Sequence, residues 1–519
     1  MSFGLKRKTE GLLLAIVFLF VALCIFFTGG LSVSAAAAYT VTVCRDGNAD
    51  SQYLPENRDW QAIASVEVTG GRVWAAWMAG GTKEPDPDNH IIVAYSNDEG
   101  ITWRDPFIII DDNGNQSTRM RDPVLWKDDT GSLWLFFGYS GTDAVVITNP
   151  EASISAIEVS EPQACFSQTI LNKPIILSSG EWLVAVDPYL ESANYSVTHI
   201  LSSADRGATW QQKGQILSHT SNKRYHEATL VEKEDGTLWC VSRIEQGTGG
   251  GLEQAFSSDG GVTWTDYEAN LDQPFRGPGS KCAMRRLSSG NLLFVNNDST
   301  SGRVNMTAYL SEDDGETWSN LLLDSRNGCA YPDIAEGDSG DIYVIWDFGR
   351  SEQNEIRVSR FLESDVKKGA FVSSWSRNMI AIAKDGAYSD FAGIEEEFPR
   401  AVCYQLGADV TTDSFAASLP STLHVVTDKG EKYVLTGKWV TNWFSADYEG
   451  NYIFRFEWDD GILPEKIADN TRLLEVVVTV ARAEDLPGGG CASSARVGDA
   501  WLGAAALLPA LYRMRKKRI

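Results

Sequence analysis

The sequence predicts an all-β chain, and three observations support that fold class. The 519 residues include 46 Gly and 17 Trp, a composition typical of short strands joined by many turns. No long stretch of apolar residues follows the helical period of 3.6. Hydrophobic residues make up 43% of the chain and aromatic residues 11%, which excludes disorder as the main state and allows large buried cores in two to four domains.

A turn motif occurs four times in the middle of the chain. Each copy reads Ser-x-Asp-x-Gly-x-Thr-Trp, and the copies span residues 96–103, 203–210, 257–264 and 311–318. In a hairpin turn, the Asp can accept hydrogen bonds from nearby backbone amides, the Gly can take a positive φ, and the Trp can pack on the following strand. We therefore interpret these motifs as structural and not as catalytic.

The spacing of this motif predicts the architecture. The interval from Asp205 to Asp259 equals the interval from Asp259 to Asp313, and Asp98 precedes Asp205 by close to two such intervals. One repeat, near residues 145–155, has therefore lost its turn motif. A period of this length suits a four-stranded propeller blade, and residues 39–390 hold about six such periods. We expect a six-bladed β-propeller.

Strand patterns agree with this period and then change. A turn glycine followed by a short apolar strand recurs once per period, at residues 131–137, 180–186, 236–242, 290–295 and 340–346. After about residue 395, alternating strands separated by turn signals are expected at residues 419–425, 432–435, 448–454 and 474–480. This second region, residues 395–482, resembles a bacterial immunoglobulin-like module, which is a small β-sandwich.

Both ends of the chain resemble export and anchoring segments. Residues 1–38 combine a basic start, an apolar run and a small-residue cleavage site, as signal peptides do, although an uncleaved membrane anchor is the alternative. Residues 483–519 combine glycines and Cys491 with an apolar run and a basic end, and resemble the glycine-cysteine sorting tails described in Synergistetes. A frayed amphipathic tail is the alternative. We expect an exported protein, outside the cell or on its surface, with membrane contact only through these terminal segments.

Charge and cysteine content restrict the partners. The net charge of −25 and the pI near 4.6 make nucleic-acid binding through a broad basic surface improbable. Only five His and no Cys-x-x-Cys pair occur, so we expect neither a metal site nor a cofactor. The six cysteines between the two ends can form disulfides in an oxidising compartment or remain buried thiols. Nothing in the sequence indicates an oligomeric state.

The four turn motifs on a six-period chain resemble the sialidase (neuraminidase) superfamily, over roughly residues 40–385. The resemblance implies a glycan substrate and a Tyr nucleophile that is activated by a Glu. The substrate of such enzymes carries a carboxylate at its anomeric centre, and that charge would repel a carboxylate nucleophile. A neutral phenol avoids this repulsion, but its ordinary pKa of about 10 requires a nearby base.

Four residues match this family pattern in chain order. Glu227, in the segment 224–231, resembles the activating Glu, and Tyr331, in Ala-Tyr-Pro-Asp, resembles the nucleophile. Arg243 and Arg303 resemble the second and third arginines of a clamp that holds the substrate carboxylate. Each also has a plain structural interpretation, as a strand-end ion pair, a core aromatic residue or a rim charge. Their correct order on successive repeats favours the site.

The first clamp arginine has no counterpart in the matching stretch, residues 60–65. Gln61 stands there instead, and its amide would suit a hydroxyl-rich sugar or a different, uronate-like acid. Two guanidinium groups of three would remain, unless Arg58 or another basic residue reaches the site. The loss of one such hydrogen-bonded charge contact costs about 1.5–3 kcal/mol, so the preference for sialic acid stays open.

The general acid and further contacts are expected in two other segments. Asp86 is our first candidate for the acid and Asp88 the second. The alternative is that their loop is only an exposed acidic turn. Arg121 and Asp122 could replace the missing substrate contacts or form a structural ion pair. Further candidates are Lys173, Arg276, Lys281 and Arg350.

The sequence thus predicts an exported, sialidase-like, retaining exo-glycosidase that acts on terminal acidic sugars. Tyr331 would attack the anomeric carbon, Glu227 would activate it and Asp86 would protonate the leaving oxygen. Two alternatives remain open: a non-catalytic glycan-binding surface protein on the same scaffold, and a propeller enzyme that acts on rhamnosyl or uronosyl linkages.

Overall fold

The computed structural model describes most of residues 39–482, in which strands dominate. Excepted are residues 115–118, 189–196, 218–223, 245–250, 271–273, 372, 374–375, 385–388, 400, 428, 442–443, 449, 460–466 and 469–473. The predicted signal peptide (1–38) and sorting tail (483–519) lie outside the described residues and stay predictions. Within the described part, no helix has the length and apolar character needed to cross a membrane. The predicted all-β class is confirmed.

Six antiparallel sheets of four or five strands follow one another along the chain. Sheet 1 contains β1 (Thr40–Val43), β2 (Gln61–Thr69), β3 (Arg72–Ala79), β4 (His90–Ser96) and β5 (Arg104–Asp111). Sheet 2 contains β6 (Arg121–Lys127), β7 (Leu133–Gly138), β8 (Thr142–Thr148), β9 (Glu158–Val159) and β10 (Gln163–Phe166). Sheet 3 contains β11 (Thr169–Ile170), β12 (Ile175–Ile176), β13 (Trp182–Asp187), β14 (Val197–Ser203) and β15 (Gln211–Leu217).

The remaining three sheets of this series have four strands each. Sheet 4 contains β16 (Tyr225–Glu232), β17 (Leu238–Ile244), β18 (Leu252–Ser257) and β19 (Glu268–Asn270). Sheet 5 contains β20 (Ala283–Arg286), β21 (Leu292–Asn297), β22 (Met306–Ser311) and β23 (Ser319–Asp324). Sheet 6 contains β24 (Cys329–Glu336), β25 (Ile342–Phe348), β26 (Glu355–Phe361) and β27 (Arg377–Ala383), with helix α2 (Glu363–Lys368) between its last two strands.

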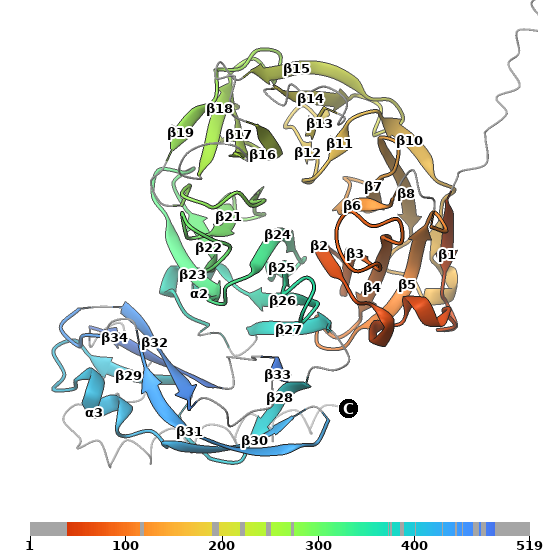
Figure 1. Ribbon diagram of the computed structural model, residues 1–519. Coiled ribbons are helices and arrows are strands. Elements are labelled where there is room, and N and C mark those ends of the chain that lie inside the picture. The colour runs from red at the N-terminus through yellow and green to blue at the C-terminus, as the bar shows by residue number, and fades with distance from the viewer. Residues whose placement is uncertain are drawn as a thin grey trace, which may run out of the picture. The chain divides into compact units, whose positions relative to one another are not determined.

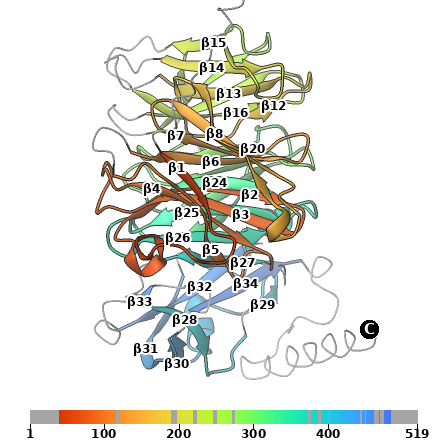
Figure 2. The ribbon, with the colours of Figure 1, turned by 90° about the vertical axis from the view of Figure 1, so that its right-hand side faces the viewer.

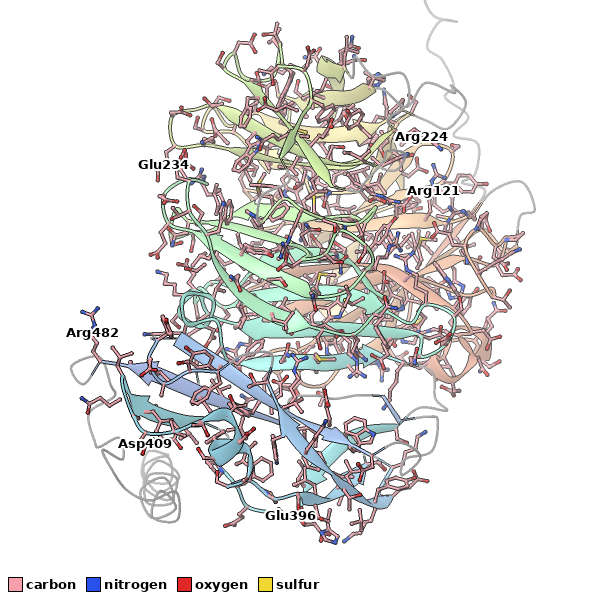
Figure 3. All side chains as sticks on the ribbon, turned by 60° about the vertical axis from the view of Figure 1, so that its left-hand side comes forward. Arg121, Arg224, Glu234, Glu396, Asp409 and Arg482 are labelled. Carbon is pink, nitrogen blue, oxygen red and sulfur yellow. The ribbon has the colours of Figure 1, made fainter. Side chains whose placement is uncertain are left out.

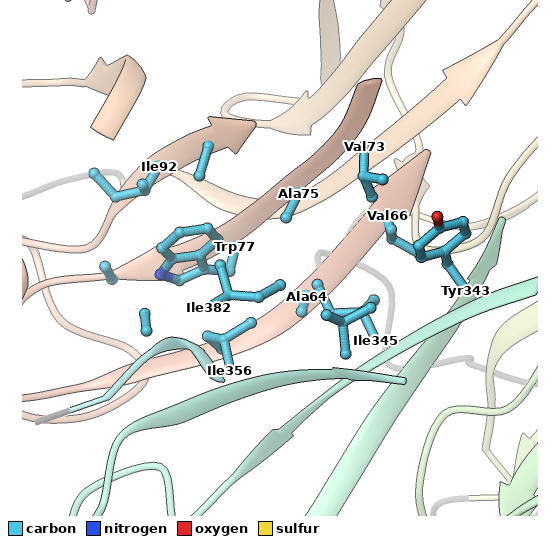
Figure 4. Packing of buried hydrophobic residues seen from close by; sticks show 14 of the residues in the cluster. Ala64, Val66, Val73, Ala75, Trp77, Ile92, Tyr343, Ile345, Ile356 and Ile382 are labelled. Atoms are coloured by element: carbon cyan, nitrogen blue, oxygen red, sulfur yellow. The ribbon is translucent and has the colours of Figure 1, made fainter. Parts of the chain in front are cut away.

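The sheets form a closed ring, with strands β2, β6, β16 and β24 nearest its centre (Figure 1). Figure 2 shows the same sheets turned by 90°. The ring closes where sheet 1 packs on sheet 6, because Val66 and Trp77 share one buried core with Ile345 and Ile356 (Figure 4). A Leu-sized side chain gains about 1.5–3 kcal/mol on full burial, so this core makes a large contribution to closure.

Four of the innermost strands carry a β-bulge at the same place, near their first residues. The bulged residues are Ile63, Asp122, Glu227 and Tyr331, with φ between 51° and 58°. A bulge re-aims one side chain out of the regular alternation, and a positive φ in a non-Gly residue is strained. Figure 3 shows Arg121 and Arg224, at the starts of β6 and β16, on the opposite side of the sheets from Glu234, which follows β16.

The recurring turn motif forms the hairpin turn between the last two strands of sheets 1, 3, 4 and 5. In sheet 3, Asp205 accepts hydrogen bonds from the Thr209 amide at 2.8 Å and the Thr209 hydroxyl at 2.6 Å. The amide of Gly207 donates to the hydroxyl oxygen of Ser203 at 2.8 Å. Sheet 2 lacks the motif at the turn that follows β8, as the spacing predicts.

The second region has a core of its own. Its strands are β28 (Ser389–Ile394), β29 (Ala401–Gln405), β30 (Thr422–Thr427), β31 (Lys432–Val440), β32 (Gly450–Trp458), β33 (Ile467–Ala468) and β34 (Glu475–Ala481), with helix α3 (Thr412–Ala416). They pair in the order β29-β34-β32-β31-β30-β28-β33, and the pairs β29–β34 and β28–β33 are parallel. Its core includes Phe415, Phe454 and Val478. The predicted strands are present, and the immunoglobulin-like assignment stays a prediction.

The cysteines between the two ends are free thiols: Cys44, Cys165, Cys240, Cys282, Cys329 and Cys403. Four of them are buried, so they act as small apolar side chains in the cores.

The glycine of the turn motif gives a test of the packing. Gly207 has φ of +81°, and an added Cβ would lie 2.8 Å from the rings of Trp134 and Trp182. We expect Gly207→Ala to lower the free energy of unfolding by about 1–2 kcal/mol through backbone strain, and by about 1–3 kcal/mol more through overpacking. Urea denaturation measures both effects. Gly236→Ala is the matched control, because Gly236 has φ of +84° and nothing within 4 Å of its Cβ position; equal losses would contradict the packing.

Candidate active site

A buried phenol, a carboxylate and a guanidinium meet at the centre of the ring. Tyr331 on β24 donates a hydrogen bond of 2.5 Å from its hydroxyl to Oε1 of Glu227 on β16. Arg243 on β17 donates from Nη1 to the same carboxylate oxygen at 2.7 Å and to the Tyr331 hydroxyl oxygen at 2.8 Å. Tyr331 is 8% exposed and Glu227 is 5% exposed. The structure therefore brings together three residues that belong to two different sheets.

The electrostatics of this triplet favour a charged base beside a neutral phenol. Burial opposes the charged form of Glu227, but the charge of Arg243 and the hydrogen bonds from Arg243 and Tyr331 outweigh it and lower the pKa of Glu227. Burial, and then the charge of Glu227, raise the pKa of Tyr331, against the opposite effect of three arginines. Within the described residues, Oε2 of Glu227 and Nε of Arg243 are buried and have no hydrogen-bond partner.

Neighbouring sheets hold Glu227 in place. Asp187, at the end of β13, accepts hydrogen bonds from the Glu227 amide at 3.3 Å and from Nδ1 of His226 at 3.1 Å. Asn172, between β11 and β12, donates from Nδ2 to the Glu227 carbonyl at 2.8 Å. These contacts hold both ends of the strained bulge residue, so the carboxylate has a defined position.

Two further guanidinium groups lie against the Tyr331 ring. The Cζ atom of Arg303, before β22, lies 5.2 Å from the ring centroid, and the Cζ atom of Arg350, after β25, lies 4.4 Å from it. Arg303 donates to the Gly279 carbonyl at 3.2 Å and, in the part of the chain that the structure describes, pairs with no carboxylate. Cations over an aromatic face are attracted by its quadrupole. Arg243, Arg303 and Arg350 therefore surround one phenol.

A second carboxyl group at this end of the ring has an altered pKa. The pKa of Asp122 is raised to about 7, first by burial and then by the charge of Glu84, against the opposing charges of Arg121 and Arg119. The charge of Glu227 also raises this pKa, which puts the two carboxyl groups in one electrostatic environment. The amide of Asp122 contacts the sulfur of Met78, which packs with Tyr331 in one apolar cluster.

Gln61 is not a substrate contact, which corrects the prediction from the sequence. It is completely buried, its Oε1 accepts a hydrogen bond of 2.8 Å from the indole of Trp77, and its Nε2 donates to the Asn354 carbonyl at 2.9 Å. Arg58 does not reach the site either, because it is buried in an ion pair of 2.7 Å with Asp105. Ala62 and Ile63, the next residues of β2, pack with Tyr331 in one apolar cluster.

The predicted acids and the other candidates lie in different surroundings. The carboxylate of Asp86 accepts the amides of Thr82 at 3.2 Å and of Asp88 at 3.1 Å, so it caps its own loop. Asp88 lies in the same loop and is exposed to solvent. Arg121 donates to the Tyr139 carbonyl at 2.7 Å and lies 3.7 Å from Asp122, which orients that carboxyl group.

The further candidates Lys173, Arg276 and Lys281 have different surroundings. Lys173 pairs with Glu67 at 3.0 Å and with Asp333 at 3.3 Å, further along the inner strands than Tyr331. Burial would raise the pKa of Glu67, but Lys173 and Arg285 lower it to about 2, as expected for a structural ion cluster. Arg276 pairs with Asp298. Lys281 is buried, and burial lowers its pKa.

Sequence reasoning missed the residues that support the site. Asp347 holds Arg350 through two hydrogen bonds of 2.9 and 3.0 Å, and Glu84 lies 3.7 Å from the same guanidinium. Asn172 and Asp187, described above, are further examples. These residues share no motif, so only a three-dimensional arrangement could reveal them. Within the described chain, no three His, Cys, Asp or Glu side chains form a candidate metal site.

Comparison with known families agrees with the repeated turns and the central site. Residues 71–344, more than half of the chain, match the model of the BNR repeat-like domain. This chain belongs to the BNR repeat-like family. The superfamily predicted from the turn motifs is thereby confirmed.

Curated relatives of this BNR repeat-like chain include two bacterial sialidases. A sialidase of Bacteroides fragilis is 28% identical over 202 residues, which cover 37% of this chain and 35% of the relative. A sialidase of Vibrio cholerae is 30% identical over 181 residues, which cover 30% of this chain and 23% of the relative. The matched part thus spans about a third or less of each relative.

Solved structures with similar chains include a protein of unknown function from Dyadobacter fermentans and a Hadza microbial sialidase. The first has a TM-score of 0.49 and 18% identity, and the match covers 60% of this chain and 96% of that chain. The second has a TM-score of 0.45 and 21% identity, and the match covers 56% of this chain and 63% of that chain.

The raised pKa of Asp122 gives a test of its burial. An unfolded Asp titrates near 3.9, whereas folded Asp122 keeps its proton up to about pH 7. The folded state therefore binds the extra proton between these values, and the free energy of unfolding falls as the pH rises from 4 to 7. We expect Asp122→Asn to remove this fall and to be more stable than the wild type at pH 8 by a few kcal/mol.

Urea denaturation at pH 5 and pH 8 measures this difference. The control is Asp105→Asn, which breaks the buried ion pair with Arg58 and should lower stability at both pH values. If the free energy of unfolding of Asp122→Asn changes with pH as that of the wild type does, Asp122 is not held protonated.

Proposed function

We propose that this chain is a retaining glycoside hydrolase of the sialidase type. The observation that carries the proposal is the hydrogen bond of 2.5 Å between the Tyr331 hydroxyl and Glu227, with Arg243 bonded to both groups. A phenol paired with a carboxylate in a buried site is an activated nucleophile next to its base. The related sialidases support this reaction class. Export of the protein, which the signal-like residues 1–38 predict, belongs to the same proposal.

In the first step, the phenol oxygen of Tyr331 attacks the anomeric carbon and the glycosidic C–O bond breaks. Glu227 takes the phenol proton, and a carboxylic acid gives its proton to the leaving oxygen. In the second step, water attacks the same carbon, and the conjugate base of that acid takes the proton of the water. The bond to Tyr331 breaks and Glu227 returns the proton, so the configuration is retained.

Asp122 is our candidate for the general acid, in place of Asp86. A general acid must hold a proton near neutral pH, and burial together with the charge of Glu84 raises the pKa of Asp122 to about 7. Asp86 caps its own loop through two backbone amides. We infer that Asp86 shapes the loop that follows β3 and that Glu84 in this loop acts on Asp122.

Tyr331→Phe and Glu227→Gln test the nucleophile and its base. Turnover of a fluorogenic sialoside should fall by about 100- to 10,000-fold in each variant, because the covalent route loses its nucleophile or its proton acceptor. Tyr53→Phe is the matched control, since Tyr53 donates a hydrogen bond of 2.5 Å to Asp111 away from this site. Its turnover should match the wild type.

Wild-type activity in both Tyr331→Phe and Glu227→Gln would refute the proposed mechanism. Absence of turnover in the wild type on any sialoside, together with binding on a glycan array, would identify the chain as a glycan-binding protein instead.

Asp122→Asn and Asp86→Asn separate the two candidates for the acid. An acid variant loses activity on natural glycosides by about 100-fold or more, but keeps most activity on an aryl glycoside with a nitrophenol leaving group, which needs no proton. We expect this pattern for Asp122→Asn and near-equal, small losses on both substrates for Asp86→Asn. Steady-state kinetics on the two substrates measure the ratio, and the reverse assignment would restore Asp86 as the acid.

A further inference from the structure

We propose that Lys281, at the centre of the ring, is a reactive amine that forms an imine with short hydroxyaldehydes. The proposed hydrolase does not use this group, so the inference goes beyond that function and does not depend on it. Lys281 precedes β20 of sheet 5 and is 2% exposed. Among the described residues it is the only buried lysine. Burial favours the neutral form of an amine, which is the nucleophilic form.

The strand register places Lys281 in the same layer of the ring as the candidate active site. Asp333 of β24 and Ala283 of β20 both pair with the residue that follows the turn glycine of the next strand by five positions. Tyr331 stands two residues before Asp333, and Lys281 stands two residues before Ala283. The same relation holds for Glu227 on β16. Sheet 5 therefore contributes an amine where sheets 4 and 6 contribute the carboxylate and the phenol.

The amino group of Lys281 is unpaired, although acidic groups surround it. The charges of Asp333, Glu227 and Asp122 act on it, and so does the charge of Lys173. Lys281 forms no hydrogen bond or ion pair with any residue that the structure describes. Its nitrogen is not fully enclosed, so it borders open space inside the ring. A small molecule in that space can therefore contact the amine.

The neighbouring carboxylates are already bonded to other groups. Asp333 accepts a hydrogen bond of 2.6 Å from the Ser65 hydroxyl and pairs with Lys173 at 3.3 Å. Glu227 is bonded to two groups of the candidate active site. Burial lowers the pKa of Lys281, against the opposing charges of these acids. The neutral amine is therefore more abundant at neutral pH than it is in an ordinary lysine.

Imine formation needs the lone pair of this amine and a proton donor. The nitrogen of Lys281 attacks the carbonyl carbon of the aldehyde and gives a carbinolamine. An acid donates a proton to the carbinolamine oxygen, which leaves as water, and the nitrogen then gives a proton back to the conjugate base. Asp122, which keeps its proton up to about pH 7, is the candidate for this acid. One amine and one aldehyde thus give one imine and one water.

The surroundings of the amine restrict the aldehyde. Tyr331 and Glu227, in the same layer, are 8% and 5% exposed, so only a short chain can enter. Carboxylates accept hydrogen bonds from hydroxyl groups, so the acids around Lys281 favour a hydroxylated chain. A short hydroxyaldehyde, which is the chemistry of a small open-chain aldose, meets both conditions.

Reductive trapping with glyceraldehyde tests the inference on the full chain. Sodium cyanoborohydride at pH 7 converts an imine into a stable secondary amine, and peptide mass spectrometry then measures the modified fraction of each lysine over time. We expect Lys281 to be modified at least about tenfold faster than Lys432, because each unit by which a lysine pKa falls raises the neutral fraction about tenfold. Lys432 represents the surface, since its side chain is 70% exposed.

Lys173 is the matched control in the same digest. Its amino group lies further along the inner strands and is bonded to Glu67 at 3.0 Å and to Asp333 at 3.3 Å, so it should remain almost unmodified. Lys281→Met gives a second measurement. Because no partner of Lys281 loses a bond, the thermal unfolding temperature of this variant should equal or exceed that of the wild type.

Two results would overturn the inference. One is modification of Lys281 no faster than that of Lys173 or Lys432. The other is a clear fall in the unfolding temperature of Lys281→Met, which would show that the amino group has a structural partner. Neither measurement uses turnover of a glycoside, so failure of the hydrolase proposal leaves both outcomes unchanged.

Discussion

The closure of the ring between sheet 1 and sheet 6 is the constraint on which the site depends. Three buried hydrogen bonds join segments from opposite ends of the ring-forming region: Ser65 to Asp333 at 2.6 Å, the Ile63 amide to Asp347 at 2.8 Å, and Gln61 to the Asn354 carbonyl at 2.9 Å. Because these groups are buried, each unmade bond would leave a desolvated polar atom, at about 1–3 kcal/mol. Closure therefore depends on specific hydrogen bonds as well as on the shared apolar core.

Closure also brings groups from four sheets to one place. Tyr331 comes from sheet 6, Glu227 and Arg243 from sheet 4, Arg303 from sheet 5 and Asp122 from sheet 2. Asp122, Glu227 and Tyr331 stand near the starts of inner strands, whereas Arg243 lies near the end of β17 and Arg303 precedes β22. The turn motifs lie between the outer strands, where they stabilise the hairpins.

Much of the fold could be predicted from the sequence because it repeats. The equal spacing between copies of the turn motif, the turn missing from sheet 2 and the second strand of sheets 2–6 all follow from local patterns that need no long-range information. The meeting of Tyr331 with Glu227 was also accessible, because the family resemblance supplied the long-range relation.

The remainder could not be read from local patterns, for physical reasons. The full burial of Gln61 arises from partners on β3 and beyond β25, and the proton affinity of Asp122 arises from burial and from Glu84 on another sheet. The position of Arg350 against Tyr331 depends on the Asp347 pair and on ring closure. Burial and charge of this kind are properties of the assembled ring.

The bulge at the start of the inner strands has a consequence for how such a protein can acquire a new reaction. Four sheets present one residue each at equivalent backbone positions, and three of those residues are polar or ionisable: Asp122, Glu227 and Tyr331. The fourth, Ile63, is a β-branched residue in the left-handed region, which is an unfavourable choice unless packing compensates. Asparagine tolerates that backbone conformation better. Ile63 is thus the position at which a single codon change could install an additional polar group beside Tyr331 while the hairpins and the ring stay as they are.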